Sequence, residues 1–255
     1  MGQRAHIYES VNDDFVTSHN QSYHLPPHHI WVRHGVLHSL FFNIFYFIFF
    51  VVSWVYAHAV LHLRIVDAAS LKKHASEASF IYGNHTLPQG DIALTVLLNY
   101  PHKVSAIMSP ANFGIPVIGL ILRHCDMLAV PHTKGQSVAF KQAMAQLVEQ
   151  HAAIAIYPEA HVWPYYTKIR PFPDRSFKYP PRYGVPAFAS TVTYQQRRFG
   201  KRPRVTVFID GPFYPDPSLD EERQRRALRD QIFAVMQRRS SASTYEYQQY
   251  RKKDS

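Results

Sequence analysis

The feature that most constrains this chain is a long uncharged stretch near its N-terminus. Between Arg33 and Arg64 there is no Asp, Glu, Lys or Arg. Its centre, residues 40–57 (LFFNIFYFIFFVVSWVYA), is almost wholly apolar. A helix needs about 20 such residues to cross ~30 Å of hydrocarbon. The sequence therefore predicts a membrane-embedded helical segment at 35–63.

Several structures are compatible with this segment. Trp31 and Trp54 flank it as in the aromatic belts at lipid–water boundaries. A cleaved signal peptide fits poorly, because the apolar run starts late, is long and lacks a small-residue cleavage site. A spanning helix and a helical hairpin in one leaflet both remain open, since His58 and His62 fall in the second half. A buried core helix is a further alternative.

The basic residues around the segment indicate its orientation. Arg64, Lys72 and Lys73 follow the apolar run, whereas the tail before it also carries acidic residues. Because Lys and Arg favour the cytoplasmic side, the part after the segment is expected on the cytoplasmic face of a cell membrane.

Composition excludes several other classes of protein. Charged residues make up 18% and aromatic residues 14% of the chain, which excludes a disordered protein. A single cysteine, Cys125, excludes a disulfide scaffold. A mean hydropathy of −0.23 is too low for a protein with many membrane spans. The net charge of +10 includes arginine clusters at 197–204 and 223–229. With a membrane segment in the same chain, we expect anionic lipid or an acidic acyl donor as their partner, and no nucleic acid.

After Arg64 the sequence alternates between short apolar runs and helical stretches. We expect strands at 78–83, 103–109, 126–131, 152–158, 186–194 and 204–211, and helices at 91–100, 116–124, 134–150 and about 219–239. Several runs are apolar without alternation, as in strands covered on both faces. The prediction is an α/β fold: a mainly parallel or mixed sheet of about six strands with flanking helices, preceded by an N-terminal membrane helix or helical hairpin.

This pattern divides the chain into four parts. A polar N-terminal tail (1–34) precedes the membrane-embedded segment (35–63), and an α/β domain (64–239) is followed by a basic polar tail (240–255). Because both tails are polar and terminal, we expect them to be loose.

The stretch IYGNHTLPQGDIAL carries the first candidate for chemistry. A strand ends at His85, Pro88 and Gly90 favour a turn, and Asp91 opens a helix. A loop that folds Asp91 back onto His85 would fix the tautomer of the imidazole and raise its basicity. The simpler alternative is that His85 is a turn residue and Asp91 only a helix cap.

The stretch AIAIYPEAHVWPYYTKIRPF carries the second candidate. An apolar strand ends at Pro158 and Glu159, and sites in open α/β sheets form beyond such strand ends. His161, Lys168 and Arg170 then bring basic groups among aromatic residues, which suits an anionic head group at a membrane surface. The alternative is a solvated loop in which Glu159 pairs with a neighbouring Lys or Arg.

Together the two stretches resemble the glycerolipid acyltransferases, the family that contains 1-acylglycerol-3-phosphate acyltransferase. NHTLPQGD is similar to the family block that runs from Asn-His to Asp, and IAIYPEA to its later block ending in Phe/Tyr-Pro-Glu-Gly. The distance between the blocks, the strand before each and the membrane-embedded N-terminus are also similar. The resemblance covers roughly residues 60–210.

The resemblance implies a membrane enzyme that transfers an acyl group from acyl-CoA or acyl-carrier protein to a lysophospholipid hydroxyl, without cofactor or metal. His85 would deprotonate the hydroxyl and Asp91 would orient His85. Asn84, Pro158 and Glu159 would help to bind the glycerol-phosphate. Two other functions remain open: a membrane-anchored esterase or thioesterase that uses the same pair on water, and a non-catalytic membrane-surface binding protein.

Three positions depart from the family pattern. Five residues rather than four separate His85 from Asp91, and Ala160 replaces the glycine of the second block. The phosphate-binding arginine expected around 131–132 is absent. A nearby basic residue could supply the missing charge: His132, Lys134, Lys168 or Arg170. His161 is a further candidate for acceptor binding.

Overall fold

The computed structural model describes residues 5–16, 22–88 and 90–253, and a seven-stranded mixed sheet lies at its centre. The strand order is β2-β8-β7-β3-β6-β4-β5, and all neighbouring pairs are parallel except the antiparallel pair β7–β8. The strands are β2 (Arg64–Val66), β3 (Ser79–Gly83), β4 (Val104–Met108), β5 (Leu128–Ala129), β6 (Ala153–Ile156), β7 (Ala187–Gln195) and β8 (Arg204–Phe213). The predicted α/β fold is confirmed, and each of the six predicted strands is present. The three-residue β2 was not predicted.

The central strands β3 and β6 position the two candidate stretches. Every residue of both strands is buried, as expected of parallel strands covered on both faces. The strands pair in parallel with Tyr82 opposite Ile156. Because the register is aligned, the residues that follow β3 and β6 leave the sheet side by side at its carboxyl edge.

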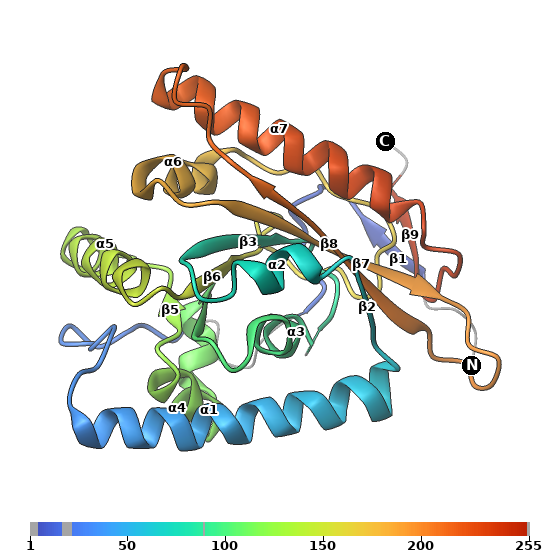
Figure 1. Cartoon of the computed structure of the whole chain (residues 1–255). Coiled ribbons are helices and arrows are strands. Elements are labelled where there is room, and N and C mark those ends of the chain that lie inside the picture. The colour runs from blue at the N-terminus through green and yellow to red at the C-terminus, as the bar shows by residue number, and fades with distance from the viewer. Residues whose placement is uncertain (1–4, 17–21, 89, 254–255) are drawn as a thin grey trace.

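Helices cover both faces of the sheet (Figure 1). The helices of the α/β domain are α2 (Ala69–Lys73), α3 (Asp91–Asn99), α4 (Ile118–His124), α5 (Lys134–Glu149), α6 (Tyr179–Tyr183) and α7 (Glu221–Ser240). Leu228, Ile232 and Met236 of α7 are buried in the core on one side, and α2 and α3 lie on the other side. The four predicted helices correspond to α3, α4, α5 and α7, while the five-residue helices α2 and α6 were not predicted.

The predicted membrane segment forms one continuous helix. α1 (Val36–Tyr56) continues as a π-helical turn (Ala57–Leu61), and it lies along one side of the domain over its whole length (Figure 1). Its inner face packs on the domain: the Tyr46 hydroxyl donates to the His102 carbonyl (2.8 Å), and the Phe50 ring stacks on Tyr100. Among the described helices it alone is long and apolar enough to cross a membrane.

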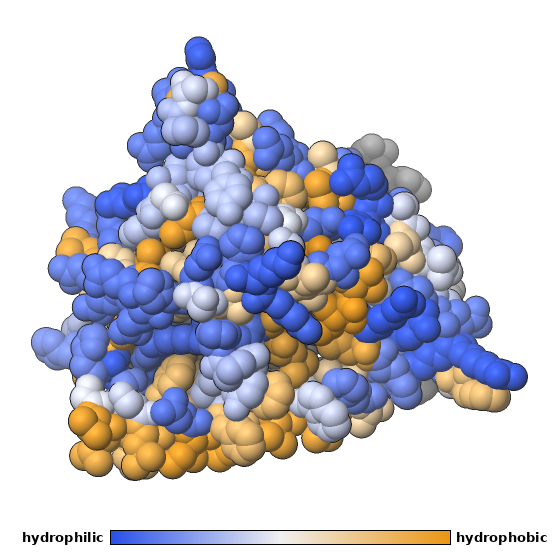
Figure 2. All heavy atoms as spheres, in the orientation of Figure 1, coloured by the Kyte–Doolittle hydropathy of each residue, from blue (hydrophilic) through white to orange (hydrophobic). Residues whose placement is uncertain are grey.

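The outer face of α1 is an exposed apolar surface. Figure 2 shows hydrophobic side chains gathered along the edge of the molecule where α1 lies. Phe41, Phe47 and Val52 are each about half exposed. Helix α4 packs on α1, and Val117 at its start and Leu120 within it add to the exposed apolar area. A buried core helix is therefore wrong. An apolar patch of this kind marks a surface that contacts another apolar phase.

The two chain ends pair with each other, so the expectation of loose tails was wrong for the described residues. β1 (Ala5–Tyr8) lies parallel to β9 (Gln249–Lys252). Phe15 contacts both the Trp163 and the Tyr250 rings, and the Trp163 indole N–H donates to the Asp13 carbonyl (2.8 Å). Aromatic residues of the two tails, such as Phe15 and Tyr250, pack together, whereas a wholly polar tail would have no apolar area to bury. Residues 1–4, 17–21 and 254–255 of the predicted tails lie outside the described residues.

Candidate active site

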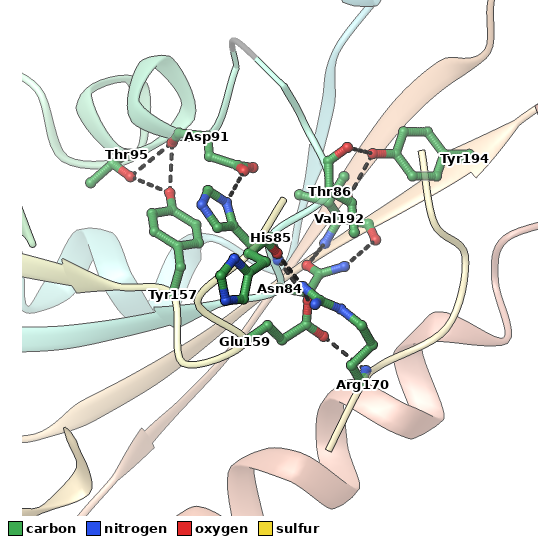
Figure 3. Close-up of polar contacts among 11 residues, drawn as sticks. Asn84, His85, Thr86, Asp91, Thr95, Tyr157, Glu159, Arg170, Val192 and Tyr194 are labelled. Carbon is green, nitrogen blue, oxygen red and sulfur yellow. Dashed lines mark hydrogen bonds and ion pairs between the residues drawn. The ribbon is translucent and has the colours of Figure 1, made fainter. Parts of the chain in front are cut away.

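His85 and Asp91 come together at the carboxyl edge of the sheet (Figure 3). His85 follows β3, Asp91 is the first residue of α3, and the His85 Nδ1 atom lies 2.5 Å from the Asp91 Oδ2 atom. An ionised carboxylate only accepts hydrogen bonds, so a neutral His85 carries its proton on Nδ1 and keeps Nε2 as the basic nitrogen. The loop with five intervening residues therefore brings the pair together.

The two side chains differ in their environment. Asp91 is buried, with 3% of its side chain exposed, whereas 21% of the His85 side chain is exposed. Burial raises the pKa of Asp91 above its ordinary value, and the hydrogen bond from His85 opposes that rise. The position of Asp91 in the first turn of α3 also favours its negative charge. The buried Asp91 carboxylate therefore orients the His85 ring, while the partly exposed imidazole remains accessible.

Tyr157 connects both members of the pair, and the sequence analysis did not single it out. Its ring stacks on the His85 ring with centroids 4.8 Å apart. Its hydroxyl donates to the Asp91 carbonyl oxygen (2.7 Å) and lies 2.8 Å from the Thr95 hydroxyl. Gly83 makes room for the ring, because a Cβ atom there would lie 2.7 Å from it. The only signal for Tyr157 in the sequence was its position as an aromatic residue directly before Pro158 and Glu159.

Glu159 holds the backbone of His85. Its Oε2 atom accepts from the His85 backbone N–H (3.1 Å) and from the Arg170 guanidinium (3.1 Å), and its Oε1 atom accepts from the Arg170 backbone N–H (2.9 Å). Burial raises the pKa of Glu159, and the positive charge of Arg170 opposes the rise. Glu159 does pair with a neighbouring basic residue, but the pair is buried rather than solvated.

The Arg170 guanidinium makes further contacts with the protein. The guanidinium donates to the carbonyl oxygens of Val11 (3.0 Å) and His161, and it lies over the Trp163 ring at 4.8 Å from the centroid. Its side chain is 2% exposed. Arg170 thus joins the N-terminal segment to the loop that carries Glu159.

Further hydrogen bonds anchor the His85 loop. The Asn84 carboxamide accepts from the Val192 backbone N–H (2.8 Å) and donates to the Val192 carbonyl (3.1 Å). The backbone N–H of Trp163 donates to the His85 carbonyl (3.0 Å). Asn84 is buried, and its side chain continues the hydrogen bonding of the sheet onto β7.

The other predicted binding residues lie further out. On the second loop Lys168 is exposed, Pro158 is half-buried, and the His161 ring lies 3.6 Å from Asp14 Oδ2. His132 and Lys134 are exposed at the start of α5, beyond β5. Since β5 is three strands from β3, and strands lie ~4.8 Å apart, these two residues leave the sheet roughly 14 Å from His85.

The comparisons with known proteins give a structural likeness to solved structures. No protein-family model and no curated protein sequence matches this chain. Its structure is similar to the crystal structure of the 1-acyl-sn-glycerophosphate (LPA) acyltransferase PlsC from Thermotoga maritima, with a TM-score of 0.54 and 15% identity over 78% of each chain. An identity of this size shows the fold alone. The chain therefore shares the fold of the acyltransferase family that its two motifs resemble.

Proposed function

We propose that this protein is a membrane-bound acyltransferase that moves a fatty acyl group from acyl-CoA or acyl-carrier protein to the hydroxyl of a lysophospholipid similar to 1-acylglycerol-3-phosphate. The observation that carries the proposal is the 2.5 Å contact between His85 Nδ1 and Asp91 Oδ2 at the carboxyl edge of the sheet. Ligands of open α/β sheets bind outside that edge. The shared fold with an LPA acyltransferase supports the same activity.

The pair performs general-base catalysis on the acceptor. The His85 Nε2 atom takes the proton of the lysophospholipid hydroxyl while the oxygen attacks the thioester carbonyl carbon. The tetrahedral intermediate then breaks its C–S bond, and the imidazolium returns the proton to the thiolate. Asp91 stabilises the imidazolium between these steps. Base catalysis of this kind contributes about 10²–10⁴-fold, so positioning of both substrates supplies most of the remaining acceleration.

Glu159, Arg170 and Asn84 act as positioning residues in this proposal, which revises the direct substrate contacts expected from the resemblance. The Glu159 carboxylate is buried and accepts from His85 and Arg170. The Asn84 carboxamide is occupied by Val192. The exposed Lys168 on the second loop is left as the candidate for the anionic head group, with His161 beside it.

The membrane attachment in this proposal uses α1 lying in the plane of one leaflet. The inner face of α1 packs on α3 and α4, and the outer face is apolar and exposed. A helix with one side on the protein and one side toward lipid suits an orientation in the membrane interface better than one that crosses the membrane alone. Leu61, at the end of the same helix, lies beside Gly90 in the active-site loop, so the site is close to the lipid surface. Arg64, Lys72 and Lys73 favour the anionic cytoplasmic leaflet.

The test is mass spectrometry of the products formed by purified protein from labelled acyl-CoA or acyl-carrier protein and a panel of lysophospholipids. We expect diacylated phospholipid from the wild type, and none above background from His85→Ala. His28→Ala, at an exposed histidine, serves as the matched control and should retain activity. Release of free fatty acid without acylated acceptor would indicate a hydrolase instead. Full turnover by His85→Ala would overturn the proposal.

A further inference from the structure

A hollow lies away from the candidate active site. It has a volume of about 530 Å³ and lies between α1, β2, α2 and the end of α3. This volume is in the range of ligand pockets. Neither His85 nor Asp91 lines it. Asp91 and Asn99 are at opposite ends of α3, about 12 Å apart at 1.5 Å per residue, so the groove is separate from the reacting groups.

One wall of the groove is apolar and continues onto the surface of α1. Phe50 and Trp54 of α1 form this wall together with Leu97 of α3. Trp54 is 49% exposed, and its neighbours Val51 and Val55 belong to the exposed apolar face. A lipid chain that leaves the groove over Trp54 would therefore enter the same apolar phase that contacts α1.

The groove lining also contains basic residues. Lys72 and His102 both line the groove and are exposed, and the described lining contains no Asp or Glu. Within 4 Å of the Lys72 Nζ atom, the described part of the chain offers no carboxylate. An ammonium without an acidic partner beside an apolar wall suits the phosphate of a lipid head group.

We propose that this groove binds one anionic phospholipid, such as phosphatidylglycerol. Its phosphate lies at Lys72, and its acyl chains leave over Phe50 and Trp54 into the leaflet. The lipid is a bound structural ligand rather than a substrate. It fixes the height of α1, and hence of the active-site loop beside Leu61, relative to the lipid phosphates.

Native mass spectrometry of the full chain in detergent, titrated with dioleoylphosphatidylglycerol, tests this site. We expect a one-to-one complex with the wild type. Lys72→Glu should weaken it at least tenfold, and Ala75→Phe, which fills the groove, should weaken it similarly. Lys73→Glu is the matched control, because it makes the same charge change on the next residue of α2, outside the lining. It should bind as the wild type does.

Two further arms identify the ligand and separate the site from catalysis. Dioleoylphosphatidylcholine should bind at least tenfold more weakly, and glycerol 1-phosphate should not compete at equal concentration, because it lacks the chains. His85→Ala should bind the lipid as the wild type does, whether or not the protein is an acyltransferase. Equal weakening by Lys72→Glu and Lys73→Glu, or equal binding of both lipids, would overturn the proposal. Should Ala75→Phe fail to fold, the two lysine variants still decide.

Discussion

The Tyr157 ring lies nearly parallel to the His85 imidazole, with an angle of 23° between their planes, while its hydroxyl donates to the carbonyl oxygen of Asp91. One side chain therefore sets the tilt of the imidazole and also ties down the helix start that supplies the carboxylate. The ring and the hydroxyl have separable contributions. A substitution of Tyr157 can remove the hydroxyl and keep the ring.

Tyr157→Phe keeps the stacked ring and removes the hydroxyl. We expect the free energy of unfolding to fall by about 0.5–1.5 kcal/mol, the usual net value of one hydrogen bond. The catalytic constant should fall by less than about tenfold, since Thr95 still donates to the Asp91 carbonyl. Tyr157→Ala should reduce the catalytic constant much further. Steady-state kinetics on both variants measure the difference, and equal activities would show that the ring has no part in positioning His85.

Asp91→Asn should separate activity from stability. By analogy with serine proteases, loss of the orienting carboxylate should reduce the catalytic constant by up to about 10⁴-fold. Burial raises the pKa of Asp91 in the folded state, so its ionised form disfavours folding at neutral pH. The wild type should therefore gain stability as the pH falls toward the folded-state pKa, and the variant should lack this gain. Thermal unfolding of both proteins, measured at decreasing pH from neutrality, compares this gain; an equal gain in the variant would contradict the assignment to Asp91.

Glu159→Gln should show whether Glu159 positions His85 or binds substrate. The amide leaves the buried Arg170 charge without a counter-ion, which costs about 3–5 kcal/mol of folding free energy. If Glu159 acts through His85, the catalytic constant falls equally with neutral and anionic acceptors. A rise in the Michaelis constant confined to anionic acceptors would instead indicate direct contact. The double variant Glu159→Gln/Arg170→Gln should recover part of the lost stability.

Lys168→Ala tests the exposed charge on the same loop. We expect a higher Michaelis constant for an anionic lysophospholipid and little change for the acyl donor, because the substitution removes a charge near the acceptor only. Lys141→Ala, an exposed lysine on α5, is the control. An equal rise in the Michaelis constant for a neutral acceptor would show that Lys168 does not recognise the head-group charge.

Phe47→Glu tests the orientation of α1. Phe47 is 53% exposed on the outer face, so a carboxylate there should not disturb packing against the domain. A charge placed in lipid costs up to about 2.5–3.5 kcal/mol, which should reduce the fraction of protein that floats with anionic vesicles. Lys141→Glu, which also introduces a carboxylate, should float as the wild type does. Unchanged flotation of Phe47→Glu would place this face away from lipid.

Continuous local patterns predicted most of the fold. The runs that became β3 and β6 are apolar without alternation, and α1 stands out by composition alone. Strand β2 was missed because three residues give no periodicity. The β1–β9 pairing was missed because it joins Ala5 to Gln249, and nothing local in either segment indicates a partner so distant in sequence.

The candidate site was predicted in part for a similar reason. His85 and Asp91 are close in sequence, so their contact follows from one loop. Glu159 was found by its place at a strand end, yet its partners include His85, 74 residues away. Whether a carboxylate faces solvent or a backbone N–H depends on the elements packed around it, and Arg170 is buried partly by the N-terminal segment. Such burial is a tertiary property that residue type and spacing do not record.

The packing of α1 has a practical consequence for anyone who wishes to handle this protein in water. Tyr46 and Phe50 stack on Tyr100 of the α/β domain, and Phe42 lies against Lys103. A shortened chain that starts after Leu61 would uncover this surface and lose the neighbour of Gly90. Deletion of α1, the usual route to a soluble form when a chain carries one long apolar helix, would here yield aggregates instead of a folded domain.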